Sequence, residues 1–263
     1  MNRIDKKFNE LKSQNKKALI TYVTAGDPSI DKTEEIIYAK EKGGASVIEI
    51  GIPFSDPLAD GPVIQNAAQN ALENGVKVNQ IFKCIENVRE NTEIPLVFLV
   101  YFNTILAYGV EEFVKECNDV GIDGLIIPDL PYEEQEEIMK YIKGSDVALI
   151  PLIAPTSKDR IKDIVKDKNG FVYCISSLGV TGMKDGFYKE VDEFLSSVRE
   201  YTNLPIAVGF GISTKEDVKR FSGLVDGVIV GSAIVKKVSD SNGDPKEVEK
   251  FVKELSSGLN YNK

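Results

Sequence analysis

A single glutamate interrupts an otherwise apolar stretch, VIEIGIP, at residues 47–53. Side chains along a strand alternate between its two faces, so Glu49 shares one face with Val47 while Ile48 and Ile50 share the other. The isoleucines suit a face covered by helices, which turns Glu49 toward the interior. An isolated buried carboxylate is costly, or its pKa rises until it is neutral. A structural Glu paired with a core Lys or Arg is the alternative, but no predicted strand contains such a cation. Glu49 is therefore our first candidate for an acid/base.

Two further carboxylates, Asp56 and Asp60, follow in a proline-stiffened loop, DPLADGP. An Asp-Gly pair is often only a turn, and that is the alternative for Asp60. Carboxylates in different surroundings can, however, divide acid and base roles between them. The chain contains no histidine, which excludes His-dependent triads and the usual zinc sites. Any acid/base chemistry must therefore use Asp, Glu, Tyr, Lys or Cys.

Two small-residue turns, GFGIS (209–213) and VGSAI (230–234), end the last two predicted strands. In barrels of alternating strands and helices, these loops and a nearby helix N-terminus often bind phosphate through backbone N–H groups. The sequence from Ser213 to Glu216 is typical of such a helix start. Tight packing of strand on helix is the alternative. A glycine-lined phosphate site explains how an acidic protein could hold an anion without arginine.

Two other features admit two interpretations each. Tyr173 offers a hydroxyl in the sixth predicted strand, where an ordinary core tyrosine is the alternative. The segment SLGVTGMKDG (177–186) has the glycines of a mobile lid, with Thr181 as a hydroxyl that closure could bring to the site. A plain surface loop would have nearly the same sequence.

The elements that must position these residues are short apolar runs alternating with amphipathic stretches. Most runs are nearly continuous and β-branched, as parallel strands covered by helices are. The intervening helical patterns close on glycine. Eight such units in 263 residues predict an α/β fold, a (β/α)8 TIM barrel, with the doubly wound sheet as runner-up. The eight runs are ALITYVT (18–24), VIEIGIP (47–53), LVFLVY (96–101), GLIIPD (124–129), ALIPLIA (148–154), FVYCIS (171–176), PIAVGFGI (205–212) and GVIVGSAI (227–234).

Length and composition predict a single barrel domain over residues 1–263. Ile4, Phe8 and Leu11 recur at helical spacing and predict a short extra N-terminal helix laid on the domain. The net charge of −9 disfavours nucleic acid and membrane surfaces as partners. No apolar run reaches the length of a membrane span, and the first residues lack the core of a secretory leader. Three widely spaced cysteines predict buried, reduced thiols, so we expect a cytoplasmic protein.

The segment EIGIPFSDPLADGPVIQ (49–65) resembles the signature of the tryptophan synthase alpha chain family. The resemblance continues in TYVTAGDP, IIPDLPYEE, SxxGVTG, GFGIS and VGSAI, and so covers nearly the whole chain. It implies a lyase of tryptophan biosynthesis that cleaves indole-3-glycerol phosphate by a retro-aldol reaction into indole and glyceraldehyde 3-phosphate, without metal or cofactor. It also implies an α2β2 complex whose beta chain, not this chain, holds pyridoxal phosphate.

The resemblance assigns roles to individual residues. Glu49 is the implied acid/base at indole C3 and at the glycerol hydroxyl, and Asp60 is implied to hold the indole N–H. The implied substrate-binding residues are Tyr22, Leu99, Ile126, Tyr173, Thr181, Gly182, Phe210, Gly211, Gly231 and Ser232. The implied partner-facing residues are Pro53, Asp56, Asn103 and Pro131.

Two positions depart from the family pattern. Tyr22 stands where the family often has phenylalanine and adds a hydroxyl that needs a partner. Ser177-Leu178 replaces a common basic-then-small pair in the lid segment. Three rival functions remain open: another phosphate-binding barrel such as a sugar-phosphate epimerase, a regulatory subunit without turnover, and a lyase that needs no partner. The first does not explain DPLADGP or GVTG.

Overall fold

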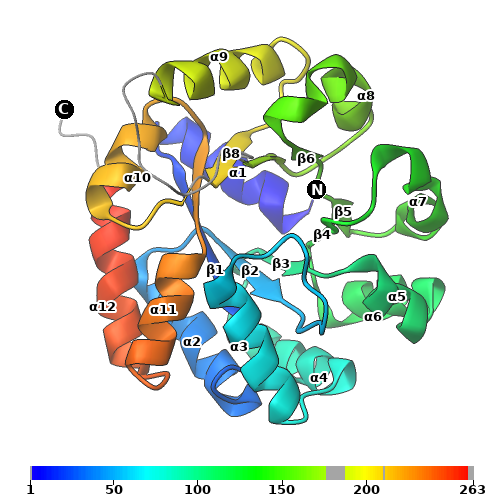
Figure 1. Ribbon diagram of the computed structural model, residues 1–263, viewed down its shortest axis with the longest axis vertical. Coiled ribbons are helices and arrows are strands. Elements are labelled where there is room, and N and C mark those ends of the chain that lie inside the picture. Colours follow the sequence, from blue (N-terminus) through cyan, green and yellow to red (C-terminus); the bar gives the residue numbers. More distant parts are fainter. Residues whose placement is uncertain (1, 176–186, 210, 260–263) are drawn as a thin grey trace.

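Parallel strands form a ring at the centre of the molecule, with helices around it (Figure 1). The computed structural model describes residues 2–175, 187–209 and 211–259. Within these residues the sheet has the order β5-β4-β3-β2-β1-β9-β8-β7-β6, and every pair of neighbours is parallel. The strands are β1 (Ala18–Thr24), β2 (Val47–Gly51), β3 (Leu96–Leu99), β4 (Gly124–Ile126), β5 (Ala148–Leu149), β6 (Leu152–Ile153), β7 (Val172–Ile175), β8 (Ile206–Gly209) and β9 (Gly227–Val230).

All eight predicted runs contain strands, and the predicted barrel is confirmed in place of the doubly wound sheet. One detail of the prediction was wrong, because the run 148–154 is split into β5 and β6. Pro151 lies at the split and has no N–H to donate. The run still joins its two neighbours: Ile150 N–H donates to the Leu125 carbonyl of β4, and Tyr173 N–H on β7 donates to the Pro151 carbonyl. The fifth run therefore closes the ring.

The helices follow the strands and cover the outer face of the ring (Figure 1). Glycines in left-handed conformations end two of them, with φ 101° at Gly44 after α2 and φ 82° at Gly121 after α6, as the sequence predicts. The helices after the first are α2 (Ile30–Gly43), α3 (Pro62–Glu73), α4 (Val78–Arg89), α5 (Phe102–Tyr108), α6 (Val110–Val120), α7 (Glu136–Ile142), α8 (Ile161–Val165), α9 (Phe187–Arg199), α10 (Lys215–Ser222), α11 (Ser232–Asp240) and α12 (Pro245–Ser256). Short 3-10 turns lie at η1 (Tyr132–Glu134), η2 (Pro155–Arg160) and η3 (Ser257–Leu259).

The strand alternation divides the apolar core in two. Ile48 and Ile50 belong to the larger cluster between the sheet and the helices, whereas Val47 belongs to a smaller cluster inside the ring with Val97 and Ile229. This division confirms the two faces expected for β2. The side chain of Glu49 therefore shares the interior with the second cluster.

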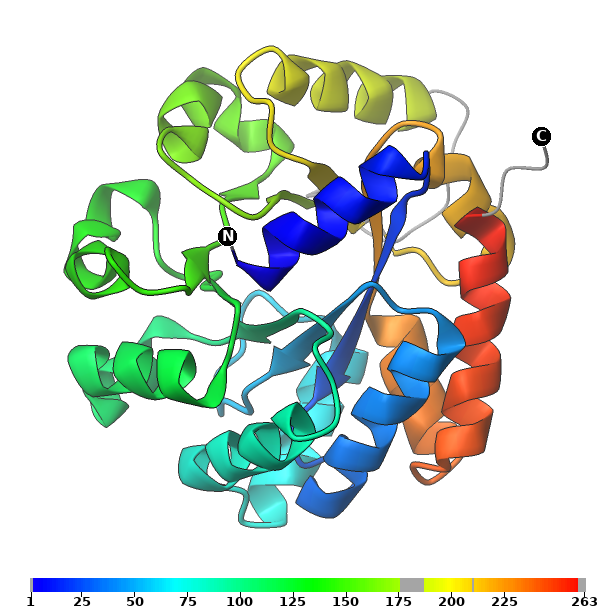
Figure 2. The same ribbon diagram turned by 180° about the vertical axis from the view of Figure 1, so that it is seen from behind.

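Helix α1 (Arg3–Ser13) lies across the N-terminal end of the barrel (Figure 2). Ile4 and Phe8 are buried in the inner cluster and Leu11 packs against it, which confirms the predicted N-terminal helix. The first turn is held by Asn2, whose side-chain oxygen accepts from Ile4 N–H. The helix thus seals the bottom of the barrel against water.

A buried carboxylate, Asp123, ties the same end together. It accepts hydrogen bonds from Arg89 Nη2 at 2.7 Å, from Arg3 Nη1 at 3.1 Å and from the Leu96 N–H at 2.8 Å. Burial raises the pKa of this carboxyl, and the charges of both arginines and the Leu96 hydrogen bond oppose that rise. Asp123 is therefore a fully partnered structural residue.

The three cysteines are buried and free, as the sequence predicts. Within the described parts of the chain, no helix combines the length and the apolar character that crossing a membrane requires.

Candidate active site

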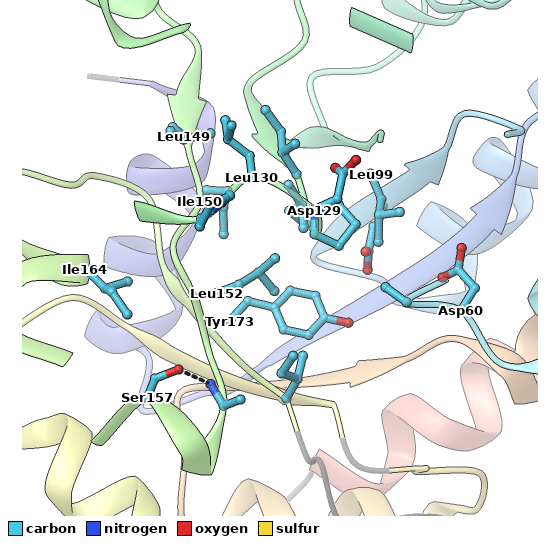
Figure 3. Close-up of a pocket in the computed structure, with 18 of the residues that line it drawn as sticks. Asp60, Leu99, Asp129, Leu130, Leu149, Ile150, Leu152, Ser157, Ile164 and Tyr173 are labelled. Carbon is cyan, nitrogen blue, oxygen red and sulfur yellow. Dashed lines mark hydrogen bonds between the residues drawn. The ribbon is translucent and has the colours of Figure 1, made fainter. Parts of the chain in front are cut away.

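A cavity of about 520 Å3 lies at the C-terminal ends of the strands, the end opposite α1. Figure 3 shows Leu152 beside the ring of Tyr173, with Ile164 toward one side of the cavity and Asp60 toward the other. The structure brings seven of the predicted catalytic and substrate-binding residues to this cavity. They are Tyr22, Glu49, Asp60, Leu99, Ile126, Tyr173 and Gly231.

Among the titratable groups that line the cavity, Glu49 is the least exposed to solvent. Its side chain is 1% exposed, and neither carboxylate oxygen has a hydrogen-bond partner among the described residues. Burial, assisted by the charge of Asp60 and opposed by that of Lys40, raises the pKa of Glu49 to about 8. A carboxyl in this setting is mostly protonated at neutral pH and can both give and take a proton.

Asp60, in the loop between β2 and α3, is more exposed to solvent than Glu49. Its carboxylate accepts a hydrogen bond from the Tyr101 hydroxyl at 3.0 Å, and that hydroxyl accepts another from the Ala59 N–H at 3.0 Å. The ring of Phe54 stacks on Tyr101 with centroids 5.1 Å apart. Burial raises the pKa of Asp60 and the Tyr101 hydrogen bond lowers it. The two carboxyls of the cavity are thus in different surroundings, one without partners and one held.

Tyr22 lies beside Glu49, because β1 and β2 pair in register with Tyr22 opposite Glu49. Its hydroxyl, which the sequence suggested needs a partner, accepts a hydrogen bond from Thr24 Oγ1 at 3.3 Å. The same hydroxyl occupies the space over Gly51, where any Cβ would collide with it. Gly51 is therefore required for this placement of the tyrosine ring.

A second cavity of about 560 Å3 adjoins the first, and Ile64, Tyr173 and Gly231 line both. Two further predicted residues, Gly211 and Ser232, line this second cavity. Together the two cavities form one elongated site with an apolar, carboxylate-bearing half and a glycine-lined half.

The two helix starts at the glycine-lined half differ. At α10, Asp217 accepts from the N–H groups of Ser213 and Thr214, and Thr214 Oγ1 accepts from Asp217 N–H. This capping box confirms the predicted helix start and occupies those N–H groups. At α11, which begins after Gly231, the N-cap has no side-chain hydrogen bond in the described structure. The α11 start is therefore the better of the two for an anion.

Several predicted residues cannot be compared with the structure. Thr181 and Gly182, Phe210, the departure at Ser177-Leu178 and the whole lid segment lie outside the described residues.

The predicted partner-facing residues lie on the rim of the cavity end. Asp56, Asn103 and Pro131 are exposed and Pro53 is half-buried. Leu58, in the same loop as Asp60, is 94% exposed.

Sequence reasoning missed two residues that act on the carboxyls. Tyr101 ends the third apolar run, and its position at the C-terminal end of a predicted strand could have marked it as a site residue. Lys40 lies on α2 in the stretch YAKEKGG, and nothing there distinguishes it from the exposed lysines of other helices.

Comparison with known proteins identifies the family of the chain. The family model described as tryptophan synthase alpha chain matches residues 8–261. A tryptophan synthase alpha chain of Thermoanaerobacter sp. (strain X514) is 51% identical over 262 residues, which cover 98% of this chain and 100% of the relative. The solved tryptophan synthase subunit alpha of Legionella pneumophila str. Paris is 33% identical, covers 98% of each chain and superposes with a TM-score of 0.91. A chain of Mycobacterium tuberculosis tryptophan synthase is 30% identical, with 99% of each chain covered and a TM-score of 0.91.

Proposed function

The chain belongs to the tryptophan synthase alpha chain family, and we propose that Glu49 and Asp60 carry out the reaction of that family in this protein. It is a carbon–carbon lyase that cleaves indole-3-glycerol phosphate into indole and glyceraldehyde 3-phosphate in tryptophan biosynthesis. The family carries no cofactor, and pyridoxal phosphate belongs to the beta chain. One observation supports the assignment above all others: two carboxyls in unlike surroundings face the same apolar cavity.

The proposed chemistry divides between these two carboxyls. Glu49 in its protonated form gives a proton to indole C3, and the indole becomes an indolenine-like cation whose N–H donates to Asp60. Glu49, now a carboxylate, takes the proton of the glycerol hydroxyl next to the bond that breaks. The electron pair of the carbon–carbon bond returns to the ring, and indole and the aldehyde are released. An unpartnered, buried carboxyl suits the first role because its pKa is near the working pH, and a held, more exposed carboxylate suits the second.

The two halves of the site suit the two ends of the substrate. We propose that Leu99, Ile126 and Tyr22 hold the indole ring in the first cavity. The phosphate then lies in the second cavity, near Gly211 and the uncapped start of α11. Tyr173 lines both cavities, so its ring lies where the glycerol must pass.

Three proposed contacts rest on the family resemblance alone. In this proposal Gly182 and Phe210 complete the phosphate site, and Thr181 closes over Asp60.

We further propose that the chain forms an α2β2 complex with a beta chain. The family works with a beta subunit, and the rim residues Pro53, Asp56, Asn103 and Pro131 together with exposed Leu58 offer a surface for it next to the site. Indole released from the cavity could then pass to the partner without reaching water. We also infer one barrel domain for residues 1–263, and a cytoplasmic location, which the free, buried thiols support.

Indole release from indole-3-glycerol phosphate by the purified chain, alone and with a tryptophan synthase beta chain, tests this proposal. We expect slow release alone and a steep rise when the beta chain is added. Absence of release in both conditions would overturn the proposal in favour of another sugar phosphate or a regulatory subunit. Fast release that the beta chain does not change would overturn the partnership and leave a stand-alone lyase.

A further inference from the structure

Lys40 on α2 is a lysine with none of its surface exposed. Its amine donates a hydrogen bond to the Tyr22 backbone carbonyl at 2.5 Å, and no carboxylate of the described chain lies within ion-pair distance of it. Lysines normally extend their amine to water, because burying an ammonium without a counter-ion is costly. A lysine placed in this way needs a reason for its burial.

The hydrogen bond directs the amine to the strand residue next to Glu49. Tyr22 on β1 and Glu49 on β2 are partners in the parallel register, and neighbouring strands lie about 4.8 Å apart. Lys40 therefore approaches Glu49 from the helix layer and contacts the backbone of Tyr22, the strand neighbour of Glu49. The substrate cavity lies on the opposite, inner side of the sheet.

Few charged or titratable groups act on Glu49 in the described structure. Asp60 faces it from the loop after β2, Tyr22 from β1 and Tyr173 from β7. Each of these three groups is an acid, so it is either neutral or negatively charged. Among the described residues, Lys40 on α2 is the one cation whose charge lowers the pKa of Glu49.

We propose that Lys40 is a positioning residue that supplies the counter-charge for the Glu49 carboxylate during the reaction. The proposal rests on the proposed acid/base role of Glu49, which must become a carboxylate once in each turnover. In a dry cavity that already contains the charge of Asp60, that carboxylate is costly. A nearby ammonium lowers the cost without entering the cavity or contacting the substrate.

The electrostatics of the two groups agree with this role. Burial lowers the pKa of the Lys40 amine and the charge of Glu49 raises it, while burial raises the pKa of Glu49 and the charge of Lys40 lowers it. Each charge thus favours the other, so loss of the Lys40 charge should make Glu49 harder to ionise.

The pH profile of kcat/KM in the Lys40→Met variant tests the proposal. We expect the alkaline limb, where Glu49 loses the proton that it must give, to move upward by about one pH unit. At neutral pH we expect kcat/KM to fall about tenfold, because the carboxylate formed during the reaction has lost its counter-charge. Lys83→Met is the matched control, because it removes an exposed lysine on α4 whose ion pair is with Glu86, and its profile should match the unaltered chain. Activity lowered equally at every pH, with an unmoved limb, would show a purely structural lysine and overturn the proposal.

A reciprocal measurement leaves Lys40 in place and decides the question even where Lys40→Met does not fold. In the chain labelled with 13C at lysine Cε, the amine of Lys40 should titrate at lower pH in Glu49→Gln than in the unaltered chain, because coupling acts equally in both directions. An identical midpoint in the two proteins would overturn the proposal. Normal cleavage by Glu49→Gln would instead overturn the acid/base assignment, whatever the lysine signal shows.

Discussion

Each end of the barrel contains a buried carboxyl, and the two carboxyls differ in their hydrogen-bond partners. Asp123 at the α1 end is 3% exposed and accepts from two arginines and a backbone N–H. Glu49 at the cavity end is 1% exposed and has no hydrogen-bond partner in the described structure. Burial alone therefore does not distinguish a structural carboxyl from a chemical one. What distinguishes them is whether the fold provides partners for the charge.

The difference has a physical cost that falls on the cavity end. A satisfied carboxylate keeps its charge and holds neighbouring elements together, whereas an unsatisfied one stays protonated and destabilises the fold as pH rises. The barrel accepts that cost at Glu49, where a movable proton is useful. At Asp123 the two arginines and the Leu96 N–H oppose it.

The largest effect we expect is on turnover in Glu49→Gln. Replacing the carboxyl with an amide of the same shape removes the proton that the reaction needs, and cleavage of indole-3-glycerol phosphate should fall about a thousandfold. The comparison with Asp123 also requires that this variant unfold at no lower denaturant concentration than the unaltered chain. Steady-state assays together with urea unfolding check both halves, and normal turnover would refute the assignment.

The opposite substitution, Asp123→Asn, should affect stability and not chemistry. Removing the charge leaves Arg89 and Arg3 without their buried partner, and the free energy of unfolding should fall by about 3 to 5 kcal/mol. The kcat of the folded protein should stay the same. Asp119→Asn on α6, which removes an exposed carboxylate paired with Lys115, is the control and should leave stability unchanged. Equal effects of the two substitutions would remove the contrast between the barrel ends.

The pH dependence of stability should show the cost at Glu49 directly. The pKa of Glu49 is raised from 4.5 to about 8 in the folded protein. The stabilising contribution of Glu49 is therefore complete below pH 4.5 and is lost as the pH rises to about 8. Glu49→Gln has no such titration. Between about pH 4 and about pH 7 the stability of the variant relative to the unaltered chain should therefore grow by about 3 kcal/mol. A constant difference over that range, measured by urea unfolding, would show that Glu49 titrates normally.

Asp60→Asn should lower kcat by about a hundredfold, because a neutral amide stabilises the indolenine-like cation poorly. The KM should change less than kcat, since the charge develops after the substrate has bound. A large rise in KM at constant kcat would assign Asp60 to substrate binding alone.

The smallest effect concerns the residue that holds Asp60. Tyr101→Phe removes one hydrogen bond to the carboxylate and retains the ring that stacks on Phe54. We expect kcat/KM to fall about fivefold, which corresponds to about 1 kcal/mol. A loss as large as that of Asp60→Asn would mean that Tyr101 takes part in the chemistry itself.

Much of the fold, and the inward position of Glu49, follow from local sequence patterns. Strand alternation was enough to turn Glu49 inward, and continuous apolar runs predicted the ring. The split at Pro151 is also a local matter, since a missing N–H is visible in the sequence, but its consequence for the ladder is not. The N-terminal helix was predicted because Ile4 and Phe8 share one helical face.

The partners of the two carboxyls could not be predicted, because they come from distant parts of the chain. Asp123 is held by Arg3, 120 residues away, and by Arg89, 34 residues away. Lys40 lies in a helix rich in lysine, and only the packing of α2 on the sheet shows that this one is buried. The predicted strands contain no cation, because the one whose charge acts on Glu49, Lys40, comes from the helix layer.

The infrared spectrum of the folded chain as a function of pH tests the central claim most directly, with Glu49→Gln as the reference. The account predicts a protonated carboxyl band that is absent from the variant, still present at neutral pH and lost with a midpoint near 8. A Glu49 band already lost at the ordinary pKa of a glutamate would contradict it, and the unpartnered carboxyl would then have no claim to the acid/base role.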